Sequence, residues 1–198
     1  MFLRGLRFDY PLMGCNKGKI MDTQIDRWGY RINVGIILAN ERGQVFWAKR
    51  AGFETAWQFP QGGVIIGEKH QDALYRELYE EVGLSSHDVI NLGCTRRWIN
   101  YRLPSPITKN SRGNIVGQRQ KWHLLVLKSA EDKINLDASL AMEVGSKPEF
   151  DAWDWVSYWY PLNAVVSFKR QAYRMALSEL APVLFHHIRQ TYYRPNFR

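Results

Sequence analysis

One short segment, Arg76–Leu84 (RELYEEVGL), constrains this chain more than any other. Glu80 and Glu81 lie three and four residues after Glu77, so a helix places their three carboxylates on one face. Leu74 and Leu78 are four residues apart and can reach a core from the same helix. The pattern predicts a helix over residues 68–83 that ends at Gly83, a residue suited to a helix C-terminus.

Three carboxylates on one helical turn need an explanation in a chain that is otherwise basic. They repel one another unless a cation neutralises them. Hard cations such as Mg²⁺ are bound by carboxylate oxygens together with substrate phosphates. An isolated acidic helical face is more often simply solvated. The helix alone therefore leaves a metal site and a solvated face both open.

The overall composition favours a polyanionic partner and argues against several other classes. The net charge is +8, which suits nucleic acid or nucleotides but is also compatible with solubility alone. Cys15 and Cys94 form no CxxC pair, which argues against a disulfide framework or structural zinc. No apolar run reaches the length of a membrane span, and the N-terminus lacks the apolar stretch of a signal peptide. We expect a cytoplasmic protein without a membrane partner.

The chain alternates between strands and helices and contains no repeat. Residues 1–20 hold four cations and one acid, so we treat them as a basic N-terminal extension and residues 21–198 as the domain. A Gly-rich loop follows residues 57–63, and a C-terminal helix is expected from residue 161, interrupted or restarted at Pro182. Strands are predicted at 32–40, 44–50, 89–103, 120–129 and 152–160. This order favours a single α/β or α+β domain with a helix on each side of the sheet.

The segment containing the acidic turn resembles the Nudix box, the loop–helix–loop signature of a hydrolase family. The spacing is Gly62, five residues, Glu68, seven residues, then RELYEEVGL, and every defining position is filled. The family hydrolyses nucleoside diphosphates linked to another group. The resemblance implies an α/β/α sandwich with a mixed sheet. It also implies two or more Mg²⁺ or Mn²⁺ ions as cofactors.

The resemblance assigns roles to the residues of the box and to one acid outside it. Glu149, in an acidic loop, is implied as a metal ligand or base. Glu68 and Arg76 are implied as an orienting pair. The implied metal ligands are Gly62 (through its carbonyl), Glu77, Glu80, Glu81 and Glu149, and the implied catalytic residues are Glu77, Glu81 and Glu149.

Segments outside the box resemble the bacterial RNA pyrophosphohydrolase group, which is related to the diadenosine polyphosphate hydrolases. They are WQFPQGG, YRINVGIIL, QKWHLLVL, PEFDAWDWVSYWYP and VVSFKR, between about residue 27 and the last helix. The chain departs from the group at Ile32, where proline is typical, and at Ile65-Ile66, where Asn-Pro is typical. Neither departure touches an implied metal ligand.

This likeness implies four further substrate contacts. Arg31 and Arg50 occupy positions of phosphate-binding arginines, and guanidinium groups suit phosphate through paired donors. Lys49 is the weaker candidate, because alternation points it away from Arg50. Phe168 and Lys169, expected at the start of the last helix, are implied to bind an RNA base, although Phe168 also suits a core. We assign no chemistry to the five histidines.

The expected reaction is metal-assisted removal of pyrophosphate from the 5′-triphosphate end of RNA, or of phosphate from a 5′-diphosphate, which leaves a 5′-monophosphate and initiates RNA decay. The first alternative is hydrolysis of diadenosine polyphosphates, which uses the same chemistry on a small substrate. The second alternative is a non-catalytic module that binds RNA or nucleotides. Loss of box glutamates would indicate such a module, and all three are present.

Overall fold

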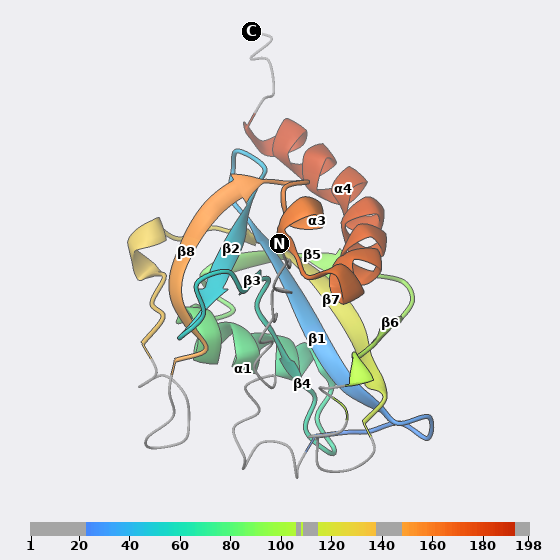
Figure 1. Ribbon diagram of the computed structural model, residues 1–198. Helices are drawn as coiled ribbons and strands as arrows, with labels where there is room; N and C mark the ends of the chain where they lie inside the picture. The colour runs from blue at the N-terminus through green and yellow to red at the C-terminus, as the bar shows by residue number, and fades with distance from the viewer. Residues whose placement is uncertain (1–22, 106–107, 109–114, 138–147, 193–198) are drawn as a thin grey trace, which may run out of the picture.

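The computed structural model describes residues 23–105, 108, 115–137 and 148–192, and an eight-stranded mixed sheet is its centre (Figure 1). The strand order is β3-β2-β1-β7-β5, with β4 also paired to β1, β6 to β7 and β8 to β2. Strands β1 and β7 run parallel over ten residue pairs, whereas the other described pairings are antiparallel. The predictions for residues 1–20 lie outside the described residues.

The bounds of the elements follow the expected alternation. The strands are β1 (Tyr30–Ala39), β2 (Gln44–Arg50), β3 (Trp57–Gln58), β4 (Gln61–Gly63), β5 (Val89–Cys94), β6 (Ile99–Arg102), β7 (Gly117–Leu127) and β8 (Phe150–Ser157). The helices are α1 (His70–Val82), α3 (Pro161–Ala164) and α4 (Arg170–Tyr192), with 3₁₀ turns η1 (Glu131–Lys133) and η3 (Ser167–Lys169).

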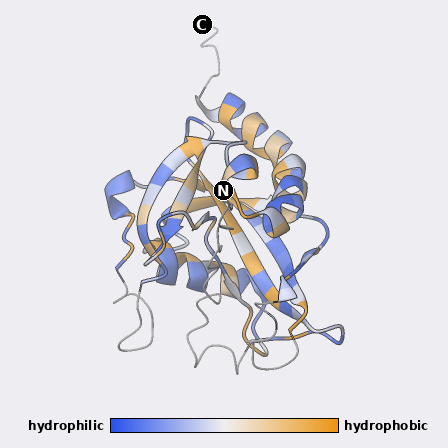
Figure 2. Cartoon of the chain, viewed as in Figure 1, coloured by the Kyte–Doolittle hydropathy of each residue, from blue (hydrophilic) through white to orange (hydrophobic). Residues whose placement is uncertain are grey.

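Two helices cover opposite faces of the sheet, so the predicted α/β/α sandwich is confirmed (Figure 1). The alternation of β1 produces both cores: Ile36 and Leu38 pack in the cluster that contains α1, whereas Ile37 and Ala39 pack in the cluster that contains α4. Figure 2 shows hydrophobic residues along the central strands, and both hydrophobic and hydrophilic residues on α4. Both helices are therefore amphipathic covers of one sheet.

Helix α1 forms as its sequence pattern predicts. Leu74 and Leu78 are fully buried in the core. Gly83 adopts a left-handed conformation, with φ of 76°, and donates its N–H to the carbonyl of Tyr79 at 2.9 Å. The helix begins at His70, two residues later than expected. Its acidic face is consequently held in a fixed orientation against the sheet.

The structure corrects three expectations about the elements. The strand predicted over 89–103 is two strands, β5 and β6, which both pair with β7. Phe168 and Lys169 belong to η3, because the long helix begins only at Arg170. The predicted interruption at Pro182 was wrong, since α4 continues through it. Pro182 lies on the exposed side of α4, where water can solvate the carbonyl that loses its helical partner. No described helix is long and apolar enough to span a membrane.

Candidate metal and phosphate site

Glu77 lies against Gly62, the glycine that precedes the acidic helix in the chain. A Cβ atom placed on Gly62 would lie 1.7 Å from the Cδ atom of Glu77. The Glu77 side chain is only 4% exposed. Strand β4 holds Gly62 opposite Val34 of β1. A side chain at position 62 would therefore displace the carboxylate, and glycine is required there by space.

Arg76 holds the loop and the helix together through several charged hydrogen bonds. Its Nε and Nη2 atoms donate to the two carboxylate oxygens of Glu68, each at 2.9 Å. Nη2 also donates to the carbonyl of Gly63 at 2.8 Å, and Nη1 donates to Oε1 of Glu77 at 2.6 Å. Glu68 in turn accepts the backbone N–H of Ile65 at 2.8 Å. Charge-assisted, bidentate pairs of this kind fix both partners in place. Burial is the largest single effect on the pKa of Arg76 and lowers it. The hydrogen bonds and charges of Glu68 and Glu77 together outweigh burial, so the pKa is raised.

The two other glutamates of the turn face the same region. Oε2 of Glu80 lies 3.6 Å from Nη1 of Arg76. Oε2 of Glu81 accepts the backbone N–H of Gln61 at 3.0 Å. Thus the three carboxylates and the β4 backbone converge, as the helical spacing predicts.

The side chains and backbone at this site offer the oxygen ligands that a hard cation prefers, because they are carboxylates beside the backbone of a glycine. Among the residues that the structure describes, no three acidic, histidine or cysteine side chains are arranged to hold a metal ion as they lie. Glu77 and Glu81 instead bond to Arg76 and to the N–H of Gln61. Cation binding therefore requires these carboxylates to turn from their present partners.

Glu149 faces Arg50 across the β2–β8 pair. Nε of Arg50 lies 3.2 Å from Oε1 of Glu149. The register of β2 against β8 shifts between Lys49 and Arg50, which marks a β-bulge. Lys49 instead pairs with Asp151 at 3.0 Å. The predicted acid and the predicted phosphate ligand are thus neighbours, and Lys49 belongs to a different ion pair.

Arg31 reaches the same loop from β1. A Cβ atom on Gly63 would lie 2.6 Å from Nη2 of Arg31, so the guanidinium covers this glycine. Gly63 is adjacent to Gly62, and its carbonyl accepts a hydrogen bond from Nη2 of Arg76 at 2.8 Å. The structure therefore places Arg31 beside the backbone that borders Glu77.

Lys169 is buried beneath the site rather than exposed at its rim. The residue is 3% exposed, and its Nζ donates to Oε1 of Gln58 at 2.8 Å and to Oε1 of Gln61 at 3.4 Å. Burial, followed by repulsion from Arg50, lowers the pKa of Lys169 to about 7, although Glu149 and Glu81 oppose this shift. Lys169 thus shares an electrostatic environment with the predicted catalytic acids. The glutamines that hold it were not predicted from the sequence.

Comparison with known proteins shows the family of this chain. The NUDIX domain model matches residues 29–177. The chain belongs to the Nudix family. It is 57% identical over 161 residues to an RNA pyrophosphohydrolase of Pseudomonas paraeruginosa, covering 81% of this chain and 97% of that protein. It is 56% identical, with the same coverage, to an RNA pyrophosphohydrolase of Pseudomonas savastanoi.

Solved structures support the Nudix fold. The E. coli dihydroneopterin triphosphate pyrophosphohydrolase has a TM-score of 0.54 at 18% identity, covering 73% of this chain and 94% of that chain. A C. elegans Ap4A hydrolase binary complex also has a TM-score of 0.54, at 15% identity, covering 78% of this chain and 98% of that chain. The chain is a Nudix hydrolase with its box intact. Enzymes of this family generally use divalent cations.

Phe168 packs against the hydrophobic cluster between the sheet and α4, at its edge. It is partly buried, and its ring centroid lies 6.0 Å from that of Tyr101 with a 41° tilt. The hydroxyl of Tyr101 donates to Oε1 of Gln118, and Gln120 donates to Oε1 of Gln61 at 3.2 Å. Burial raises the pKa of Tyr101. Phe168 therefore combines a packing contact with a partly open surface beside a polar network.

A pair of histidines at the N-terminus of α1 was not predicted from the sequence. Nδ1 of His70 lies 3.1 Å from Nε2 of His123, and Trp98 contacts His70 edge-on with centroids 5.9 Å apart. Burial, aided by His70 and Lys121, lowers the pKa of His123 to about 4. The two histidines are 53 residues apart in the chain. No spacing rule could have paired them, because His70 lies on α1 and His123 on β7, and only the packing of the helix on the sheet brings them together.

Proposed function

We propose that this Nudix hydrolase removes pyrophosphate from the 5′-triphosphate end of RNA and leaves a 5′-monophosphate, a step that initiates RNA decay. The observation that supports this most is the 57% identity to an RNA pyrophosphohydrolase, which extends over 97% of that relative. The matched range includes residues far outside the box, so the likeness is not to the family signature alone. The positions of Arg31 beside Gly63 and of Arg50 beside Glu149 are consistent with a polyanionic 5′ end.

The proposed cofactor is Mg²⁺ or Mn²⁺, with two or more ions. The residues that would hold them are Glu77, Glu80, Glu81, Glu149 and the carbonyl of Gly62. When bound, such ions lower the pKa of a water molecule and neutralise phosphate charge. Arg76 keeps Glu77 beside Gly62 through its 2.6 Å hydrogen bond, and the Glu77 carboxylate turns from Arg76 when an ion binds.

The protein itself supplies the base and the phosphate contacts. Glu81 or Glu149 takes the proton of the attacking water, since both are carboxylates at the edge of the same site. Arg31 and Arg50 neutralise the charge that develops on the phosphate oxygens as the P–O bond breaks. Nε of Arg50 bonds Glu149 at 3.2 Å, so a phosphate held by Arg50 would lie next to this carboxylate.

We propose that Phe168 stacks on an RNA base near the 5′ end, because its ring is partly exposed and Lys169 and Arg170 follow it in the chain. Lys169 contributes through charge and through Gln58 and Gln61, since its ammonium group is enclosed by these side chains. This assignment differs from the direct base contact that the sequence analysis expected. Single strands are generally held by such combinations of rings and positive charge.

The experiment that tests this function compares two substrates with one purified preparation. We expect kcat/KM on 5′-triphosphorylated RNA to exceed that on diadenosine tetraphosphate in the presence of Mg²⁺ or Mn²⁺. Pyrophosphate and 5′-monophosphorylated RNA should be the products. Faster turnover of the dinucleotide would favour the small-substrate alternative, and turnover of neither would favour a binding module.

A further inference from the structure

Part of the sheet lies beyond the N-terminus of α1 and presents polar and aromatic side chains. Arg119 of β7 is in register with Ile32 of β1 on one side and Asn100 of β6 on the other. Residues in register point to the same face of a sheet. Ile32 and Ile36 are four residues apart on β1, so their side chains point to the same face of the sheet. Ile36 packs in the cluster that contains α1, so Arg119 lies on the face of the sheet that α1 partly covers. Helix α1 begins at His70, and among the described residues no other helix covers this end of the face.

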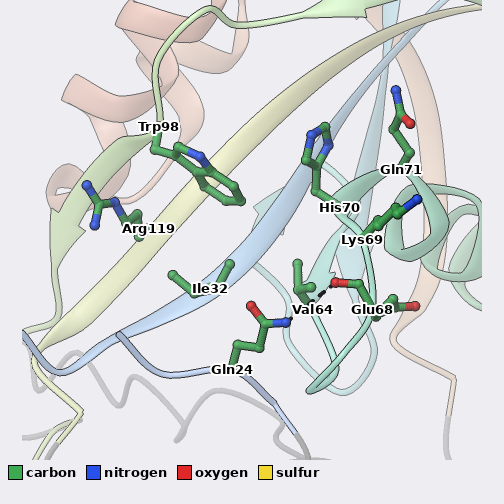
Figure 3. A pocket seen from close by; sticks show the side chains of 9 residues that line it. All are labelled: Gln24, Ile32, Val64, Glu68, Lys69, His70, Gln71, Trp98 and Arg119. Atoms are coloured by element: carbon green, nitrogen blue, oxygen red, sulfur yellow. Dashed lines mark hydrogen bonds between the residues drawn. The ribbon is translucent and has the colours of Figure 1, made fainter. Parts of the chain in front are cut away.

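Two pockets adjoin on this part of the sheet, and Arg119 lines both. The first has a volume of about 630 Å³ and is lined by Trp98, His70, Lys69, Gln71 and their neighbours. Figure 3 shows Trp98 and Arg119 on one side of it and His70, Lys69 and Gln71 on the other. The second has a volume of about 480 Å³, and its lining residues are Trp28, Tyr30, Asn100, Arg102, Val116 and Arg119. We call these together the two-pocket surface.

Each pocket combines an indole ring with cations. Trp28 is 54% exposed, and the guanidinium carbons of Arg27 and Arg119 lie 4.2 and 5.2 Å from its ring centroid. Nζ of Lys121 lies 5.9 Å from the ring centroid of Trp98. The cations therefore lie over the faces of these rings, as in cation–π contacts, and Trp28 is the more exposed of the two rings.

The charge of the two-pocket surface is positive. Asp26 is its nearby acid, and it is already bonded to Arg119 at 3.0 Å. Glu68, which lines the first pocket, is bonded to Arg76. The cations that border the surface are Arg27, Lys69, Arg102, Arg119 and Lys121. Aromatic rings interleaved with an excess of cations suit a single-stranded nucleic acid, whose bases stack and whose phosphates are anionic.

The two-pocket surface adjoins the charged network of the proposed catalytic site. Glu68 lines the first pocket, and its carboxylate binds Arg76, which also binds Glu77. The Glu68–Arg76 pair therefore links the first pocket to one of the proposed metal ligands.

We propose that the two-pocket surface binds the single-stranded segment of RNA downstream of the 5′ end, with one base on Trp98, one on Trp28 and a phosphate at Arg119. This inference rests on the proposed function for its choice of RNA. It adds a subsite that favours longer unpaired 5′ ends over the shortest triphosphorylated substrates.

The test uses Trp28→Ala and Arg119→Gln, each with a matched control elsewhere. Trp159→Ala removes a tryptophan of similar exposure, 45%, and Arg189→Gln removes an exposed arginine of α4. Binding of a ten-nucleotide RNA with a 5′-hydroxyl end is measured by fluorescence anisotropy, so the result does not depend on hydrolysis. Melting temperatures show whether each variant is folded, and Trp98→Phe serves as a conservative variant that keeps an aromatic platform.

We expect Trp28→Ala and Arg119→Gln to raise Kd by roughly tenfold, whereas both controls and Trp98→Phe stay near the parent protein. Arg119→Gln should also reduce the slope of log Kd against log salt by about 0.7, the value for one phosphate contact on a single strand. On triphosphorylated substrates, kcat/KM should fall for a ten-nucleotide RNA but not for a dinucleotide.

Equal affinities in the variants and controls would overturn the proposal. Parallel losses on diadenosine tetraphosphate and on long RNA would also overturn it, because the pockets would then hold the second nucleoside of a small substrate. Weaker binding by the variants, in a protein that hydrolyses no triphosphorylated RNA, would refute the proposed function and support the RNA surface.

Discussion

The carboxylate of Glu77 occupies the space that a side chain on Gly62 would need. A Cβ atom on Gly62 would come within 1.7 Å of Cδ and 2.0 Å of both carboxylate oxygens. Arg76 holds the carboxylate in that position. The position of one proposed metal ligand therefore depends on the absence of a side chain on another residue of the box.

Gly62→Ala should lower kcat/KM by about 10- to 100-fold, the range typical of disturbed supports around a metal site. The free energy of unfolding should fall by about 1–3 kcal/mol, the usual cost of a methyl group inserted into a packed site. Gly52→Ala is the matched control, because its Cβ would meet nothing within 4 Å. The control should lose only some stability, since Gly52 has a φ of +81°. Equal activity losses in the two variants would contradict this reading.

Phe168→Ala tests the proposed base contact. We expect kcat/KM on triphosphorylated RNA to fall by about tenfold, as for the loss of one stacking platform, with a smaller effect on a nucleoside triphosphate. The competing explanation is loss of the packing contact with Tyr101, which would lower the melting temperature and affect both substrates alike. Measuring both turnover ratios and the melting temperature on one preparation separates the two explanations.

The His70–His123 pair predicts a specific sensitivity to acid. The pKa of His123 is lowered from 6.5 to about 4, so between these values the unfolded chain binds a proton that the folded chain does not. The free energy of unfolding should therefore fall as the pH falls from 6.5 towards 4, by up to about 3 kcal/mol, and be unaffected above 6.5. Urea unfolding at pH 7 and pH 5 measures this directly.

His123→Phe should remove much of that pH dependence, because it removes the buried imidazole. His87→Gln, at an exposed histidine, should keep it. If His123→Phe retains the same loss of stability between pH 7 and pH 5 as the parent, another group is responsible.

Deletion of residues 1–20 should leave kcat on triphosphorylated RNA largely unchanged, because the recognised motifs begin after Met21. These residues carry Arg4, Arg7, Lys17 and Lys19, so the truncated protein should bind RNA more weakly at low salt only. Steady-state kinetics at two salt concentrations provide the measurement. A large fall in kcat/KM that persists at high salt would place this segment in the site itself.

Local patterns predicted α1 well because its signals agree with one another. The spacing of Leu74 and Leu78 and the stop at Gly83 specify the same helix and the same buried face. The continuation of α4 through Pro182 could not be predicted, because the tolerance of proline depends on which side of the helix faces water. That orientation is set by the tertiary packing.

The arrangement of side chains in the candidate site was predicted where it depends on the helix and missed where it depends on the sheet. The convergence of Glu77, Glu80 and Glu81 follows from helical geometry alone. The burial of Lys169 depends on Gln58, which is 111 residues away and reaches it only in the folded protein. Similarly, the register of β7 against β1 and β6 places Arg119 between the two pockets.

The acidic turn of α1 is the centre of the proposed mechanism, and its most direct test is the hydrolysis of 5′-end-labelled triphosphorylated RNA by the parent protein, Glu80→Gln and Glu81→Gln. Glu131→Gln, at an exposed glutamate of η1, is the control. We predict that the parent and the control convert the RNA to its 5′-monophosphate in the presence of a divalent cation. Both box variants should be slower by more than about 100-fold while unfolding at similar temperatures. Near-normal turnover by both box variants, or no conversion by the parent protein, would contradict the account.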